Sequence, residues 1–162
     1  MYIDFKAEET MLMTQLAILT NSTVSTNVFH HKLPEQALDI FAVRINGGKP
    51  SISGTSAVIE NAGGDLVGKF KTYDKAIDFR QKVFDLFSSG WRLQSGTTIK
   101  CAYLKELGKI YVVDDSTEHD SGEYYRVEMM LNLYMSGDIH KILVDANGDF
   151  ILDGSNNIQY EV

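Results

Sequence analysis

The strongest constraint on the fold is one stretch, residues 125–135, in which every second side chain is apolar. The polar residues Arg126, Glu128 and Asn132 lie between the apolar ones. Successive side chains of a strand point to opposite faces of a sheet, so the pattern predicts a long strand with one dry face. That face needs a second layer of structure to cover it. Its apolar positions are Tyr125, Val127, Met129, Leu131, Leu133 and Met135.

Shorter alternating stretches predict further strands. Gly63-Gly64 followed by Asp65 is typical of a hairpin turn, because glycine readily adopts the backbone conformations that such turns require. The two flanking strands are therefore expected to pair antiparallel, with the turn projecting beyond the sheet. The predicted strands cover residues 37–45, 55–61, 66–71, 97–104 and 110–113.

Apolar residues spaced by three and four predict a first helix over residues 4–20. Glu8 and Glu9 are expected near its N-terminus, where a negative charge interacts favourably with the helix dipole. The predicted apolar face consists of Phe5, Leu12, Leu16 and Leu19.

The same spacing predicts a second helix over residues 73–87. Thr72 can cap its start and Gly90 can end it. We expect its apolar and aromatic face to lie on the sheet. That face consists of Tyr73, Ala76, Ile77, Arg80, Val83, Phe84 and Phe87.

Together these elements predict an α+β fold: a mixed, largely antiparallel sheet packed by two main helices, with a C-terminal hairpin. Asn147-Gly148 favours a tight turn, which predicts that residues 142–144 and 150–152 form this hairpin. With 162 residues the chain has the size of one domain. We therefore expect a single domain over residues 1–162, in which residues 136–162 are an extension.

Composition argues against several classes of protein. The net charge is −7 and no run of basic residues is present, which disfavours a surface that neutralises nucleic acid phosphates. Cys101 is the single cysteine, so no disulfide can form within the chain. No apolar run approaches the length needed to cross a bilayer, and no secretion signal is recognisable at the N-terminus. We expect a protein of the cytoplasm with no contact to a membrane.

The sequence predicts no catalytic, cofactor-binding or metal-binding residues. His30, His31, His119 and His140 have no His or Cys partners at metal-ligand spacing. Residues 145–149 begin like a calcium loop, but this loop would need glycine where Phe150 stands and glutamate where Asn156 stands. The hairpin interpretation is therefore favoured there. Cys101, on a predicted strand face, is expected to pack rather than react.

Residues 114–123 form a predicted loop rich in carboxylates. It could bind a cation, repel DNA or form a solvated surface, and the solvated surface is the favoured reading. Because loops and hairpin tips carry much of protein function, we expect this loop and the predicted turn at 61–66 to approach neighbouring subunits or a lumen. The candidate residues for these contacts are Asp114, Asp115, Glu118, Asp120, Asn61 and Asp65.

The order of elements resembles a known family. Leu33-Pro34-Glu35-Gln36-Ala37-Leu38-Asp39-Ile40-Phe41 leads into the turn Gly47-Gly48-Lys49-Pro50, and Val67-Gly68-Lys69-Phe70-Lys71-Thr72-Tyr73-Asp74-Lys75-Ala76 then forms a strand and a helix start. This arrangement is similar to that of the tail terminator or minor capsid proteins of phages with long, non-contractile tails. The resemblance covers residues 33–135. The strand before the helix lacks the arginine often seen there, and residues 138–162 extend beyond the family pattern.

The resemblance implies a structural virion protein, made in the cytoplasm of a bacterial host. It would form a six-membered ring that closes the head-proximal end of the tail tube, binding the tail tube protein on one side and the head-completion protein on the other. DNA would pass through the ring without specific binding, which the acidic charge favours. The alternatives are a head–tail connector or stopper, a small metal-dependent hydrolase using the acidic loop and His119, and a free-standing protein-binding module.

Overall fold

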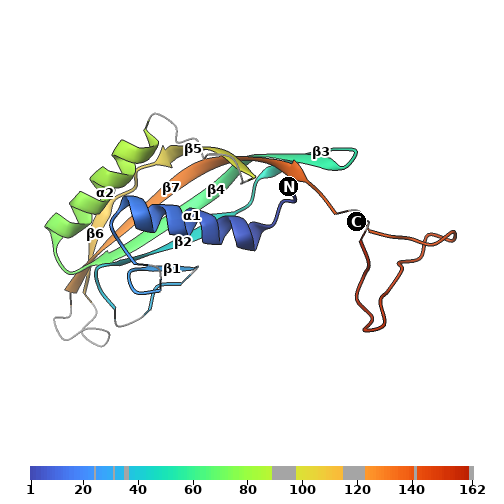
Figure 1. Cartoon of the computed structure of the whole chain (residues 1–162). Helices are drawn as coiled ribbons and strands as arrows, with labels where there is room; N and C mark the ends of the chain where they lie inside the picture. The colour runs from blue at the N-terminus through green and yellow to red at the C-terminus, as the bar shows by residue number, and fades with distance from the viewer. Residues whose placement is uncertain are drawn as a thin grey trace.

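The computed structural model describes residues 1–23, 25–30, 32–34, 37–88, 98–114, 123–140 and 142–160. These residues have an α+β fold, in which two helices pack on a seven-stranded sheet (Figure 1). The predicted fold class is therefore confirmed. In chain order the elements are α1 (Phe5–Leu19), β1 (Val28–His30), β2 (Ile40–Asn46), β3 (Lys49–Ser53), β4 (Ser56–Phe70), α2 (Tyr73–Phe87), β5 (Ile99–Glu106), β6 (Ile110–Asp114) and β7 (Glu123–Asp138).

Two long strands, β4 and β7, form the centre of the sheet and pair antiparallel. The order across the sheet is β1-β2-β4-β7-β5, with β3 beside β4 and β6 beside β7. Only β1 runs parallel to its neighbour, β2, among the described strands, and this pair makes the sheet mixed. The sequence reasoning missed β1, which lies in the polar connection after the first helix.

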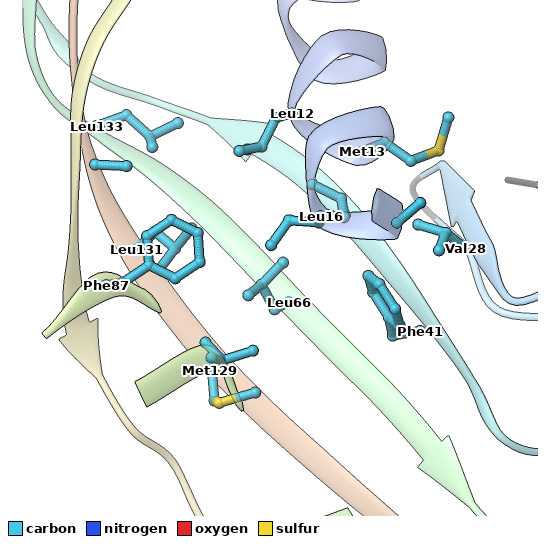
Figure 2. Close-up of a cluster of buried hydrophobic side chains, with 14 of the residues drawn as sticks. Leu12, Met13, Leu16, Val28, Phe41, Leu66, Phe87, Met129, Leu131 and Leu133 are labelled. Atoms are coloured by element: carbon cyan, nitrogen blue, oxygen red, sulfur yellow. The ribbon is translucent and has the colours of Figure 1, made fainter. Parts of the chain in front are cut away.

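Both helices lie on the same face of the sheet and enclose the hydrophobic core against it (Figure 2). The alternation in β7 supplies the floor of this core, as predicted, with Met129, Leu131 and Leu133 buried. Leu66 of β4 lies beside them, and Leu12 of α1 approaches from above. The two layers predicted from one strand pattern are thus present.

Helix α1 begins at the predicted place but presents a different face to the core. The side chain of Asp4 caps it, accepting hydrogen bonds from the backbone N–H groups of residues 6 and 7. Leu12 and Leu16 are buried, whereas Phe5 is exposed. Glu8 lies in the first turn of the helix, as expected, and both Glu8 and Glu9 are buried. The interpretation from the helix dipole did not predict this burial, which gives the two carboxylates a structural role.

The predicted hairpin at Gly63-Gly64 is wrong, because β4 continues without interruption through both glycines. Gly63 pairs with Asn46 of β2, and Gly64 with Ile45 of the same strand. A side chain at position 64 would crowd the core, since its Cβ would lie 3.2 Å from the Cβ of Leu131. The glycine therefore serves close packing between strands rather than a turn. The irregularity lies earlier, at Asn61, which has a φ of 57° where the register with β7 shifts.

Helix α2 has the predicted bounds, and the Thr72 side chain caps it as expected. Its apolar arc is wider than the face that contacts the sheet. Four residues are buried: Ala76, Phe79, Val83 and Phe87. Tyr73, Ile77 and Phe84 were predicted to lie on the sheet but remain exposed. The predicted stop at Gly90 lies outside the described residues.

Two shorter strands also depart from the prediction. Pro50 was expected in a turn but lies within β3, opposite Ile59. β3 pairs with β4 alone among the described strands, and an edge strand tolerates a residue without a backbone N–H. In β5 the register shifts between Ile99 and Cys101, so the expected alternation is lost and Tyr103 points to solvent.

Candidate functional site

The residues predicted for subunit contacts occupy two unrelated places. Asp114 is the exposed last residue of β6. Asp115, Glu118 and Asp120 lie outside the described residues, so the role of the acidic loop stays a prediction. Asn61 and Asp65 lie within β4 and not on a projecting hairpin tip.

Asp65 contributes to the face of the sheet opposite the helices, which we call the open face. Its Oδ2 atom accepts a hydrogen bond from Arg44 at 2.9 Å and another from the amide of Asn46. Its Oδ1 atom is buried without a hydrogen-bond partner. Asn61 accepts a hydrogen bond of 3.0 Å from Asn132 of β7. Both candidate residues therefore make contacts within the subunit.

A second polar group on the open face joins β6 to β7. Glu128 Oε1 accepts hydrogen bonds from Arg126 at 2.7 Å and from the Tyr111 hydroxyl at 2.8 Å. The bond from Arg126 holds the pKa of the Glu128 carboxyl below its ordinary value, and the bond from Tyr111 acts in the same direction. Burial raises the pKa of Tyr111, and its bond to Glu128 adds to that rise. Neither shift moves a group towards neutral pH, where general acid–base catalysis works best.

A shallow hollow of about 270 Å³ lies between these groups on the open face. It is lined by charged side chains of both signs, including Arg44, Asp65, Arg126 and Glu128. Lys69, further along β4, is buried. Its Nζ donates a hydrogen bond of 3.2 Å to the backbone carbonyl oxygen of Pro34. The open face is thus a polar surface whose described charges are largely paired.

No group of three or more His, Cys, Asp or Glu side chains lies close enough to hold a metal ion within the described ranges. His140 instead stacks on the ring of Tyr2 at a centroid distance of 3.7 Å. Cys101 is half-buried in β5. None of the described helices has the length and hydrophobicity needed to span a bilayer.

The most unusual feature is the segment that follows β7, residues 142–160, which we call the C-terminal arm. It extends away from the body of the molecule (Figure 1). Three backbone hydrogen bonds close a ring within it: Leu143 N–H donates to Gln159, Gln159 N–H to Ile151, and Ile151 N–H to Leu143, all at 2.9 to 3.0 Å. The three residues are spaced by eight positions, so the arm has an approximate threefold repeat.

The two described corners of this triangle are built alike. Asp145 accepts hydrogen bonds from the backbone N–H groups two and four residues later, and Asp153 does the same. Gly148 and Asn156 occupy equivalent places, and both have positive φ. The hydrogen bond from the backbone of residue 149 is the main cause that lowers the pKa of Asp145. For Asp153 the corresponding bond comes from the backbone of residue 157.

One face of the arm is mainly apolar. The residues just before and just after Leu143 and Ile151 point to the same side of the arm, because side chains alternate along an extended chain, and so do those on either side of Gln159. Antiparallel bridges join these flanking residues in pairs. The pairs are Ile142 with Tyr160, Val144 with Phe150, and Leu152 with Ile158. All six side chains are between 37% and 60% exposed, so nothing in the described structure buries this face.

The arm was predicted as one hairpin, which describes only its first corner. Its repeat is visible in the sequence once the spacing is known, because Val144-Asp145 and Leu152-Asp153 each open a short polar turn followed by Phe150 or Ile158. Two copies of eight residues are too few for periodicity to stand out against chance.

A second apolar surface lies on the outside of α2. Tyr73, Ile77 and Phe84 are between 38% and 49% exposed and lie at helical spacing on one side, with Arg80 among them. We call these four residues the α2 stripe. The Tyr73 ring also contacts Tyr125 edge to face, at a centroid distance of 5.9 Å.

The comparison with protein-family models gave no match, and no curated protein matches the chain.

Proposed function

We propose that the protein is a structural subunit that assembles with copies of itself into a ring, and that this ring ends the tail tube of a phage. The proposal is carried by the two apolar surfaces, the face of the C-terminal arm and the α2 stripe. Both expose several large apolar side chains together. Monomeric proteins seldom expose large clusters of apolar side chains to water. Such clusters commonly mark contacts with other molecules.

The position of these surfaces suits a ring. The arm and α2 lie at opposite ends of the molecule (Figure 1), so one subunit offers separate surfaces to two neighbours. A contact between unlike surfaces repeats from subunit to subunit and closes when the rotation between them allows it.

The specific assembly is inferred from the resemblance of residues 33–135 to phage tail terminators. In that role the ring would bind the tail tube protein and the head-completion protein. The net charge of −7 agrees with a lumen through which DNA moves, because like charges lower adhesion. The acidic residues 114, 115, 118 and 120 are our candidates for the lumen or for subunit contacts.

Tail tubes polymerised from the tube protein of the same phage provide the test. Addition of the protein is expected to stop elongation and to leave a ring at one tube end in negative-stain images. Tubes that grow to the same length, with bare ends, would refute the terminator role. Rings that bind heads but never tubes would identify a head–tail connector or stopper instead.

A further inference from the structure

We propose that the apolar face of the C-terminal arm binds the α2 stripe of a second copy of the chain, head to tail. This inference rests on the proposed function, in which copies of the chain assemble, and it specifies the contact that joins them. The two surfaces involved are the six bridged side chains of the arm and the stripe formed by Tyr73, Ile77, Arg80 and Phe84.

The arm requires a partner surface because its own structure buries little. Its backbone is held by the ring of three hydrogen bonds and by the turns at Asp145 and Asp153. A segment this short rarely buries enough surface to be stable alone in water, and its apolar face contributes only when it leaves water. The strand end that precedes the arm is fixed to the body, since Ile3 N–H donates a hydrogen bond to Asp138 and Ile139 N–H donates one to Thr55. The arm therefore starts from an ordered part of the sheet.

Charge favours the α2 stripe as the surface that receives the arm. The arm carries Asp145, Asp149 and Asp153 and no basic residue between positions 142 and 160. Two arms placed face to face would bring these acidic rims together, which is unfavourable. The stripe offers a cation, Arg80, among its apolar side chains.

The acidic side chains of α2 do not disturb this match. Asp74, Asp78 and Asp85 lie away from the stripe in the helical repeat of about 3.6 residues per turn. An acidic, apolar arm therefore meets an apolar surface with a central positive charge.

The contact has to be between different chains. The arm leaves the body at the end of β7 near the N-terminus, whereas α2 lies at the far end of the sheet (Figure 1). The arm therefore lies far from the α2 stripe of its own chain (Figure 1). Repetition of the contact gives each subunit one donor surface and one acceptor surface, as a closed ring requires.

Site-specific cross-linking tests the contact. In a background with Cys101→Ser, one tagged chain carries Phe150→Cys in the arm and a second, differently tagged chain carries Phe84→Cys in α2. We expect mild oxidation of the mixture to give a mixed disulfide between the two chains. The matched control replaces Phe84→Cys by Ile18→Cys, an exposed position on α1 with 67% exposure, and is expected to give at least about tenfold less mixed disulfide.

A charge exchange provides a second test that does not depend on cysteine chemistry. Arg80→Glu is expected to weaken self-association by roughly tenfold or more, and the same chain with Asp149→Lys is expected to recover it. Asp149 is exposed and Arg80 lies on the outer side of α2, so neither the core of the sheet nor the carboxylates that hold the arm's turns are altered. Circular dichroism of each variant checks that the fold is retained.

The outcomes separate this inference from the proposed function. Rings that persist without a mixed disulfide and without any effect of Arg80→Glu would overturn the arm contact and leave ring assembly standing. A disulfide that forms only between two arms would overturn it as well, in favour of arm pairing. An unmodified chain that stays monomeric, together with cysteine variants that give no mixed disulfide, would overturn both.

Discussion

Glu8 and Glu9 lie in the first turns of α1, and both carboxylates point towards the sheet. Glu9 accepts a hydrogen bond of 2.9 Å from the backbone N–H of Ile45, and Glu8 one of 3.0 Å from that of Thr98. These bonds connect the helix to β2 and to the start of β5. Two acidic residues that sequence reasoning assigned to the helix dipole therefore satisfy backbone donors in the interior, where an unpaired donor is costly.

Replacement Glu9→Ala is expected to lower the free energy of unfolding by about 2 kcal/mol, because the partly buried Ile45 N–H loses its carboxylate acceptor. Glu9→Gln keeps an acceptor and is expected to cost less. Urea denaturation measures both changes. Glu60→Ala, at an exposed position in β4, serves as the control and should stay within about 0.5 kcal/mol. Equal effects at Glu9 and Glu60 would contradict the buried role.

Gly108 and Gly54 both have positive φ but differ in their surroundings. A Cβ at Gly108 would lie 1.5 Å from the carbonyl oxygen of Glu128, whereas one at Gly54 would meet nothing within 4 Å. Gly54→Ala should cost only the backbone strain, about 1–2 kcal/mol, and Gly108→Ala should cost clearly more because the backbone has to shift. Thermal denaturation compares the two variants. Similar midpoints would contradict the close approach of Gly108 to the backbone of Glu128.

At the scale of elements, long patterns were predictable and irregular ones were not. The alternation of β7 and the spacing of α2 each repeat often enough to define a strand and a helix. The break assigned to Gly63-Gly64 was wrong because glycine also permits close packing within a strand, and the signal of β4 is interrupted by the bulge at Asn61. Buried roles such as that of Glu9 depend on contacts far apart in the chain, which local patterns do not contain.

The turns of the C-terminal arm are expected to depend on pH. Hydrogen bonds lower the pKa of Asp145 and Asp153 in the folded arm, so their stabilising effect is present above the ordinary Asp pKa of about 3.9 and is lost as pH falls through the folded value. The amide NMR signals of Asp149 and Asn157 should therefore move towards random-coil positions as pH falls below the ordinary Asp pKa. Signals of the β7 core, such as Leu131, serve as the control. Arm signals that do not change would contradict the turn geometry.

At the scale of the whole molecule, the structure combines a sheet packed on one face with two apolar surfaces at its ends. The fold class followed from the sequence, but the surfaces did not. The α2 stripe belonged to an arc that was expected to be buried, and the apolar face of the arm depends on a threefold arrangement of short segments. Both surfaces become visible only when the packing of the core shows which apolar residues it leaves out.

The acidic loop gives a prediction at this scale. Replacement of Asp114, Asp115, Glu118 and Asp120 by Ser is expected to leave the unfolding midpoint nearly unchanged, because the sequence predicts a solvated loop there and substitutions in such loops rarely alter stability. Ring assembly or DNA passage should change instead, which complementation of a phage lacking the protein would measure. Full infectivity of the variant would argue against a role in the lumen or in subunit contacts.

Ring assembly is the central claim, and sedimentation velocity of the unmodified chain over a range of concentrations tests it most directly. A closed ring predicts conversion of the monomer into one larger species of fixed sedimentation coefficient as concentration rises. Monomer at every concentration, or a continuous series of ever larger species that never closes, would contradict the account.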